Sequence, residues 1–209
     1  GCQRDRADAS RLGDALERRG FFATRQAREA DLIVLNTCVV RQNAEDKVVG
    51  RLSSLKSVKN GDADAHPFLI VMGCFVDDPA ALTDAYPFVD AFLHPSDVDG
   101  ALDLVDRWLQ AWDVAVCSPR ELLAPAEVTD LVPISYGCDH HCTYCIVTLR
   151  RGDQQSRPLD EIVADVEHLV RRGAREITLL GQNVDAYGSD LGGGQDLADV
   201  LHAIHDVEG

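Results

Sequence analysis

The sequence has no long apolar run. None of its 209 residues belongs to a segment that approaches the roughly 20 consecutive apolar residues of a transmembrane helix. Its first residues show no signal peptide either. We therefore expect a cytoplasmic protein that has no membrane partner.

Basic residues are scarce compared with acidic residues. The chain contains 20 Lys and Arg against 35 Asp and Glu, which gives a formal net charge of −15 at pH 7. Contacts with phosphate groups need Lys and Arg, so this balance argues against a general polyanion-binding protein. A local basic patch is still compatible with it.

The cysteines do not suit a disulfide framework. There are seven, an odd number, and they are widely spread in a chain too long to be a disulfide-stabilised miniprotein. Because no export signal is present, we expect a reducing compartment, in which these residues are thiols or metal ligands. Cys117 lies in a region without other candidate ligands, and we do not expect it to be a metal ligand.

Strand and helix patterns alternate along the whole chain. Segments such as "DLIVLNTC" (31–38) and "FLIVMGC" (68–74) are short and wholly apolar, which is typical of strands buried on both faces of a parallel sheet. Amphipathic segments follow them at 43–58 and 96–112, and this alternation predicts an α/β layer fold.

Periodicity fades and prolines appear between residues 113 and 130, which indicates a linker. We predict an open parallel-sheet α/β domain over 1–115, a linker over 116–130, and the start of a (β/α) barrel over 131–209. In the last region the strands are expected at 131–137 and 176–184, with helices at 158–172 and 196–207. We expect a fragment that is truncated at both ends.

A compact set of cysteines follows the predicted strand 131–137. Cys138, Cys142 and Cys145 have the spacing C-x-x-x-C-x-x-C, with His140 and His141 between them. A zinc site would need four ligands in a closed shell, and either histidine could be the fourth. Three thiolates on a [4Fe–4S] cube would instead leave one iron open to a substrate or cofactor. The spacing favours the cluster over zinc.

A dispersed set of cysteines lies at equal intervals in the first domain. Cys38 and Cys74 each follow a predicted buried strand, Cys2 heads a predicted helix, and both intervals are 36 residues. Ligands of open parallel sheets bind at the carboxyl ends of the strands, so these three thiols can converge. Buried structural cysteines are the alternative; the shared position favours a second cluster.

These motifs carry a resemblance to a known family. The loop "GCDHHCTYCIV" resembles the cluster loop of radical S-adenosylmethionine (SAM) enzymes. Together with "GCQ", "NTCVVR", "VMGC" and "LLGQNV", it resembles the methylthiotransferases, which are radical SAM enzymes with an additional N-terminal cluster domain. The residues "NTCVVR" and "LLGQNV" are most similar to those of the branch that acts on N6-isopentenyladenosine in tRNA.

The resemblance implies two [4Fe–4S] clusters and SAM as cofactors. The dispersed set would hold an auxiliary cluster, and the compact set would hold the cluster that binds SAM. By the same resemblance, the SAM-binding residues would include Tyr144, Gly181, Gln182 and Asn183. The last three depart from the glycine-rich sequence that is commoner at this place in the superfamily.

The resemblance also implies the reaction and its partners. A tRNA would be methylthiolated at carbon 2 of the modified adenosine, with an electron donor and a sulfur source as further partners. The threonylcarbamoyladenosine and ribosomal-protein branches are alternatives, and a non-catalytic iron–sulfur or zinc module is an alternative of another class. Family members continue into a basic RNA-binding region, so we expect this fragment alone to bind tRNA weakly and to be inactive.

Arginines flank the compact set in the segment "LRRGDQQSRP". Arg150, Arg151 and Arg157 could form salt bridges to Asp153 and Asp160 in a solvated loop. Alternatively, Arg151 and Arg157 could bind the SAM carboxylate or an RNA phosphate, because both groups are natural partners of arginine. The sequence leaves both readings open.

Paired carboxylates in the first domain have no place in the radical reaction that the resemblance implies. Asp77 and Asp78 are therefore interpreted as surface residues.

Overall fold

The computed structural model describes residues 2–39, 42–61, 66–112 and 128–209. The chain divides into two compact units between Glu121 and Leu122. The predicted α/β class is confirmed, because parallel strands and helices alternate in both units. None of the described helices combines the length and the apolar character that crossing a bilayer would require.

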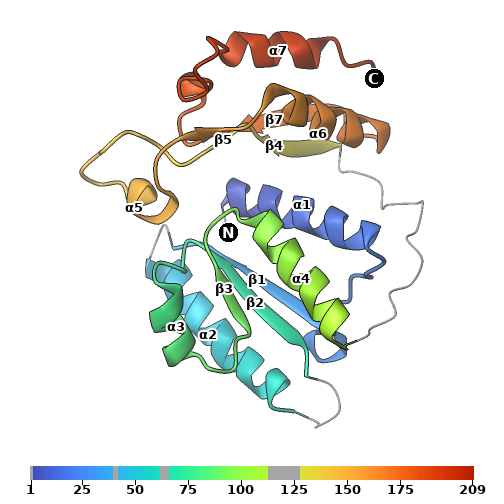
Figure 1. Ribbon diagram of the computed structural model, residues 1–209, viewed down its shortest axis with the longest axis vertical. Coiled ribbons are helices and arrows are strands. Elements are labelled where there is room, and N and C mark those ends of the chain that lie inside the picture. The colour runs from blue at the N-terminus through green and yellow to red at the C-terminus, as the bar shows by residue number, and fades with distance from the viewer. Residues whose placement is uncertain (1, 40–41, 62–65, 113–127) are drawn as a thin grey trace. The chain divides into compact units, whose positions relative to one another are not determined.

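The N-terminal unit is a three-stranded parallel sheet between two helical layers. The strand order is β1-β2-β3. Helices α1 and α4 cover one face of the sheet, and α2 and α3 cover the other (Figure 1). Its elements are α1 (Gln3–Arg18), η1 (Ala27–Glu29), β1 (Leu32–Thr37), α2 (Gln42–Lys59), β2 (Phe68–Gly73), α3 (Pro79–Ala85), β3 (Ala91–Leu93) and α4 (Val98–Trp112).

The central strand β2 explains why this unit has a core on both faces. Its Leu69 and Val71 pack with Leu52 of α2 on one face. Met72 points to the opposite face and packs with Leu12 of α1. Side chains alternate across a strand, so a strand with apolar residues at every position fills two cores at once.

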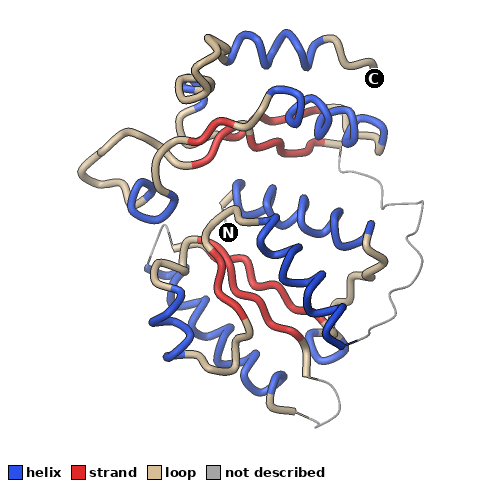
Figure 2. Tube along the Cα trace, in the orientation of Figure 1, coloured by secondary structure: helices blue, strands red, loops and turns tan. Residues whose placement is uncertain are grey.

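The C-terminal unit contains a parallel strand pair and a small antiparallel pair. β4 pairs with β7, and β5 pairs with β6; the strands are drawn in red in Figure 2. Its elements are β4 (Thr129–Pro133), β5 (Ser135–Tyr136), α5 (Val147–Arg151), β6 (Gln155–Ser156), α6 (Leu159–Arg171), β7 (Glu176–Leu180), η2 (Val184–Ala186) and α7 (Leu197–His205).

The single strand expected over residues 131–137 is divided in the structure. The Ile134 N–H still donates to the Leu180 carbonyl of β7 at 2.8 Å, but Ser135 pairs with Ser156 instead. The carbonyl of Ile134 accepts a hydrogen bond from the Arg157 N–H at 2.8 Å. This change of partner directs the following residues away from β7 and into the loop that carries the compact cysteine set.

Candidate metal centres

The dispersed cysteines lie at the carboxyl edge of the first sheet. Cys38 directly follows β1 and Cys74 directly follows β2. The two strands are paired up to Thr37 and Gly73. The Cys74 N–H then donates to the Thr37 carbonyl at 3.0 Å. Register therefore brings together two cysteines that are 36 residues apart in the sequence.

A buried hydroxyl holds these two strand ends together. Thr37 Oγ1 donates to the Met72 carbonyl at 2.7 Å, and it accepts from the Phe75 N–H at 3.3 Å. Thr37 is only 1% exposed. A buried hydrogen bond is costly to remove, so this hydroxyl helps to fix Cys38 relative to Cys74.

The third cysteine of the dispersed set caps helix α1. Cys2 is the N-cap residue of this helix, as the sequence predicted for a residue heading a helix. One ligand atom of each of Cys2, Cys38 and the buried Asp5 lies within 4.8 Å of the others. Cys74 is buried and lies outside this group of three.

The compact cysteines occupy the loop that follows β5. Cys138 is buried, Cys145 is half-buried and Cys142 is exposed. A turn joins the last two, because the Cys145 N–H donates to the Cys142 carbonyl at 3.0 Å. Among the described residues, their three sulfur atoms do not form a group within 4.8 Å of one another.

Contacts within its own neighbourhood position this loop. The Cys138 N–H donates to the Gly152 carbonyl at 3.1 Å, and Thr148 Oγ1 donates to the Cys138 and His140 carbonyls. Gly137 has φ +63°, and a Cβ there would collide with the carbonyl oxygen of Asp153. Only glycine combines this φ with such a close backbone approach.

The segment Gly181, Gln182 and Asn183 directly follows β7. β7 is parallel to β4, so this segment and the cysteine loop leave the same edge of the strand pair. Asn183 Nδ2 lies 2.9 Å from His140 Nε2, which joins the two loops. Sequence reasoning considered His140 only as a possible zinc ligand and missed this contact, which joins two residues 43 positions apart.

The remaining predicted contact residues differ in exposure. Tyr144 is 91% exposed and Arg151 is half-buried at the end of α5. Arg157 is 6% exposed and forms ion pairs with Asp165 at 2.8 Å and Glu161 at 3.5 Å. Its guanidinium also donates to the Pro133 carbonyl at 2.8 Å, so it links β4 to α6.

Asp78 has a local structural role. Its carboxylate caps α3 by accepting hydrogen bonds from the N–H groups of Ala80 and Ala81. This agrees with its interpretation as a residue outside the reaction, and Asp77 is exposed beside it.

Two ionisable groups beside β6 have displaced pKa values. Burial raises the pKa of Tyr187, whose hydroxyl donates to the Arg157 carbonyl at 2.8 Å. Burial also acts to raise the pKa of Asp190, but hydrogen bonds, above all from Ser156, lower it overall. One of these bonds joins the Ser156 N–H to the Asp190 carboxylate at 2.7 Å.

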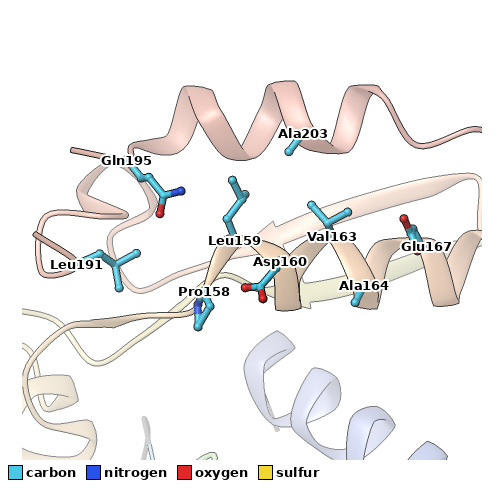
Figure 3. A pocket seen from close by; sticks show the side chains of 9 residues that line it. All are labelled: Pro158, Leu159, Asp160, Val163, Ala164, Glu167, Leu191, Gln195 and Ala203. Atoms are coloured by element: carbon cyan, nitrogen blue, oxygen red, sulfur yellow. The ribbon is translucent and has the colours of Figure 1, made fainter. Parts of the chain in front are cut away.

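Each unit also contains a pocket outside the cysteine sets. A groove of about 770 Å³ lies between α6 and α7, with Leu159, Val163 and Ala203 among its lining residues (Figure 3). A pocket of about 720 Å³ borders α1, β1 and the segment between them. No cysteine is among the described residues that line either pocket.

Comparisons with known proteins agree with both halves of the motif pattern. Residues 1–94 match the model of the uncharacterized protein family UPF0004, and residues 132–204 match the radical SAM superfamily. Similar curated proteins include those of Herpetosiphon aurantiacus (41% identical), Roseiflexus sp. (42%) and Chloroflexus aurantiacus (41%). Each is named tRNA-2-methylthio-N(6)-dimethylallyladenosine synthase.

These alignments cover 100% of this chain and 48%, 44% and 45% of the three relatives, respectively. The chain thus spans about half the length of the curated relatives that it matches. The two matched families occur in the order that the motifs predicted, and the identity extends over both units. The resemblance drawn from the motifs is confirmed, because the whole chain aligns with these relatives and residues 132–204 match the radical SAM superfamily.

Proposed function

We propose that this chain is the cluster-binding half of an enzyme that methylthiolates carbon 2 of N6-dimethylallyladenosine in tRNA. The observation that carries this proposal is the presence of a set of three cysteines in each of two separate units. The names of the similar proteins supply the substrate. The electron donor and the sulfur source are partners of the same proposed reaction, which would take place in the cytoplasm.

The domain limits proposed from the sequence fit this function. The first matched family ends at residue 94, within the proposed domain 1–115, and the second lies within 131–209. The division between Glu121 and Leu122 falls inside the proposed linker. The linker's residues from 116 to 127 lie outside the described part of the structure.

The family implies two [4Fe–4S] clusters and SAM, and the residues present fit these groups. Cys2 and Cys38 already approach each other, and Cys74 is tied to the strand end that carries Cys38. Iron–sulfur clusters are held by thiolates, and three thiolates leave one iron for another ligand. We assign the auxiliary cluster to these residues.

We assign the second cluster to Cys138, Cys142 and Cys145. When bound, the clusters and SAM supply one-electron and radical chemistry, which substitution at an unactivated aromatic carbon requires. Among the proposed SAM contacts, Gly181, Gln182 and Asn183 leave the same strand edge as the loop.

Individual side chains have distinct proposed tasks near the compact set. Asn183 and His140 hold the cysteine loop and the following loop together. Tyr144 and Arg151 are available to contact SAM or RNA, because one is exposed and the other is half-buried. For Arg157 the internal ion pairs and the bond to Pro133 support a positioning task at the base of the loop.

Metal analysis tests the cluster assignment on this chain. After anaerobic reconstitution we expect about eight irons and about eight sulfides per chain, the content of two [4Fe–4S] clusters. Cys38→Ala and Cys142→Ala should each lower the iron content to about four, whereas Cys117→Ser should leave it unchanged. A single zinc without sulfide would overturn the proposal in favour of a structural metal module.

Nucleoside analysis tests the substrate. The full-length gene should restore 2-methylthio-N6-dimethylallyladenosine to the tRNA of a bacterial strain that lacks this activity, as measured by mass spectrometry. Cys38→Ala and Cys142→Ala should each abolish that product. Appearance of a methylthiolated threonylcarbamoyladenosine or ribosomal protein instead would assign another branch of the family.

A further inference from the structure

Asp5 is a buried carboxylate beside two of the proposed cluster ligands. Only 5% of this residue is exposed. One of its carboxylate oxygens lies within 4.8 Å of the sulfur atoms of Cys2 and Cys38. The first helical turn thus brings an oxygen ligand to the place where the dispersed thiolates converge.

The backbone around Asp5 is fixed from two directions. Its carboxylate accepts a hydrogen bond from the Cys2 N–H at 2.9 Å. Its carbonyl accepts from Asn36 Nδ2, also at 2.9 Å, which ties the first turn of α1 to the end of β1. The carboxylate is therefore held toward Cys38 by the same contacts that hold Cys2.

The chemistry of these three side chains suits a metal centre. Thiolates and carboxylates are both metal ligands, and two cysteines and one carboxylate here offer ligand atoms within 4.8 Å of one another. A residue that only caps a helix does not need a place beside Cys38, which lies on another element of the fold.

We propose that Asp5 is the non-cysteine ligand of the auxiliary cluster, at the iron that the three cysteines leave open. This inference rests on the proposed function, since it assumes that the auxiliary cluster is bound. An oxygen ligand is harder than a thiolate, and soft sulfur ligands compete well for such metals. Asp5 would thus protect the open iron and yield it to an incoming sulfur ligand.

The experiment uses the chain with Cys142→Ala, so that only the auxiliary cluster is present. Asp5→Asn and Asp5→Ala remove the negative ligand. Asp8→Asn is the matched control, because Asp8 is equally buried on the same helix but bonds to Ser96 Oγ at 2.7 Å. The protein is reconstituted with iron-57, and the unique iron is followed by Mössbauer spectroscopy.

We expect both Asp5 variants to change the spectrum of the unique iron and to bind added methanethiolate about tenfold more tightly than the parent. Asp8→Asn should leave both quantities unchanged. Parent-like spectra and affinities in the Asp5 variants would overturn the inference. Absence of iron and sulfide from the parent chain would overturn the proposed function itself, so the two failures are distinguishable.

A further variant tests the inference even if Asp5→Asn and Asp5→Ala lose the cluster. Asp5→Cys offers a stronger ligand at the same place. We expect the introduced thiol to resist iodoacetamide while the cluster is bound, and to react once iron is chelated, as read by peptide mass spectrometry. Rapid alkylation of that thiol in the cluster-loaded protein would show that position 5 does not reach the iron.

Discussion

The two cysteine sets depend on different features of the fold. In the N-terminal unit, 36-residue intervals separate the cysteines, and the pairing of β1 with β2 and the start of α1 bring them together. In the C-terminal unit, the three cysteines lie within one loop of eight residues. The dispersed set depends on the packing of a whole unit, whereas the compact set depends on local backbone geometry.

A core substitution in the N-terminal unit should give the largest difference between the two cysteine sets. Leu52→Ala removes a fully buried side chain of α2 that packs on β2, and should cost about 2–5 kcal/mol of unfolding free energy. We expect iron to be lost from the auxiliary site and retained at the compact site. Urea unfolding and iron counting measure the two effects.

Val49→Ala is the matched control for that experiment, because Val49 is 41% exposed on the same helix. Its effect on stability should stay within about 0.5 kcal/mol. Equal iron loss from both sites in Leu52→Ala would show that the compact set also depends on the N-terminal core.

The reverse substitution should affect the compact set alone. Gly137→Ala places a Cβ against the Asp153 carbonyl and forces alanine into a positive φ, at a cost of about 2–5 kcal/mol. We expect loss of the iron held by the compact set, with the auxiliary iron retained. Iron counting in a Cys38→Ala background isolates the compact site, and counting in a Cys142→Ala background isolates the auxiliary site.

Gly152→Ala is its control, since Gly152 has φ +72° but open space around a Cβ. Only the conformational cost of about 1–2 kcal/mol should remain. Equal iron loss in both glycine variants would attribute the effect to the left-handed conformation, and the close approach to Asp153 would then have no separate role.

These contrasts also explain what the sequence could reveal. The strand ends at Cys38 and Cys74 were predictable because each follows a continuous apolar run. Cys2 was predicted to head a helix, and α1 does begin at Gln3. An apolar pattern does not reveal that the first turns of this helix are buried, because their buried side chains include Arg4, Asp5 and Asp8.

Other parts of the site depend on tertiary contacts, which the apolar periodicity of the sequence does not predict. The division of strand 131–137 results from pairing with β6, a strand of only two residues. Asp5 resembles an ordinary acidic residue in the first turn of a helix, and its position near Cys38 depends on the fold. His140 likewise acquires a partner only when β7 and the cysteine loop leave the same strand edge.

The contact between His140 and Asn183 joins the compact loop to the segment after β7 through two side chains. His140→Ala should lower the stability of this connection by about 1 kcal/mol. In this variant, the electron paramagnetic resonance signal of the reduced compact cluster with SAM added should differ from that of the parent chain. The iron content should be unchanged.

A double-mutant cycle with Asn183→Ala measures the coupling between the two side chains. If they act through their mutual bond, the double variant should resemble either single variant. Additive effects would mean that His140 and Asn183 act independently, and the proposed link between the loops would be wrong.

The smallest expected effect concerns Asp190, whose carboxylate anchors β6 beside the compact loop through the Ser156 N–H. Its pKa is lowered in the folded chain, so the ionised form favours folding. This contribution is fully present above the ordinary aspartate pKa of about 4 and is lost as the pH falls through the lower folded pKa. Because the residue is exposed, solvent screening should keep the contribution below about 1 kcal/mol.

Asp190→Asn should therefore reduce the unfolding free energy at pH 7 and weaken its decline between about pH 5 and 3, as measured by urea unfolding. Asp185→Asn, an exposed neighbour, should change neither quantity by more than about 0.5 kcal/mol. An unchanged pH dependence in Asp190→Asn would show that the bond to Ser156 does not stabilise the base of the cysteine loop.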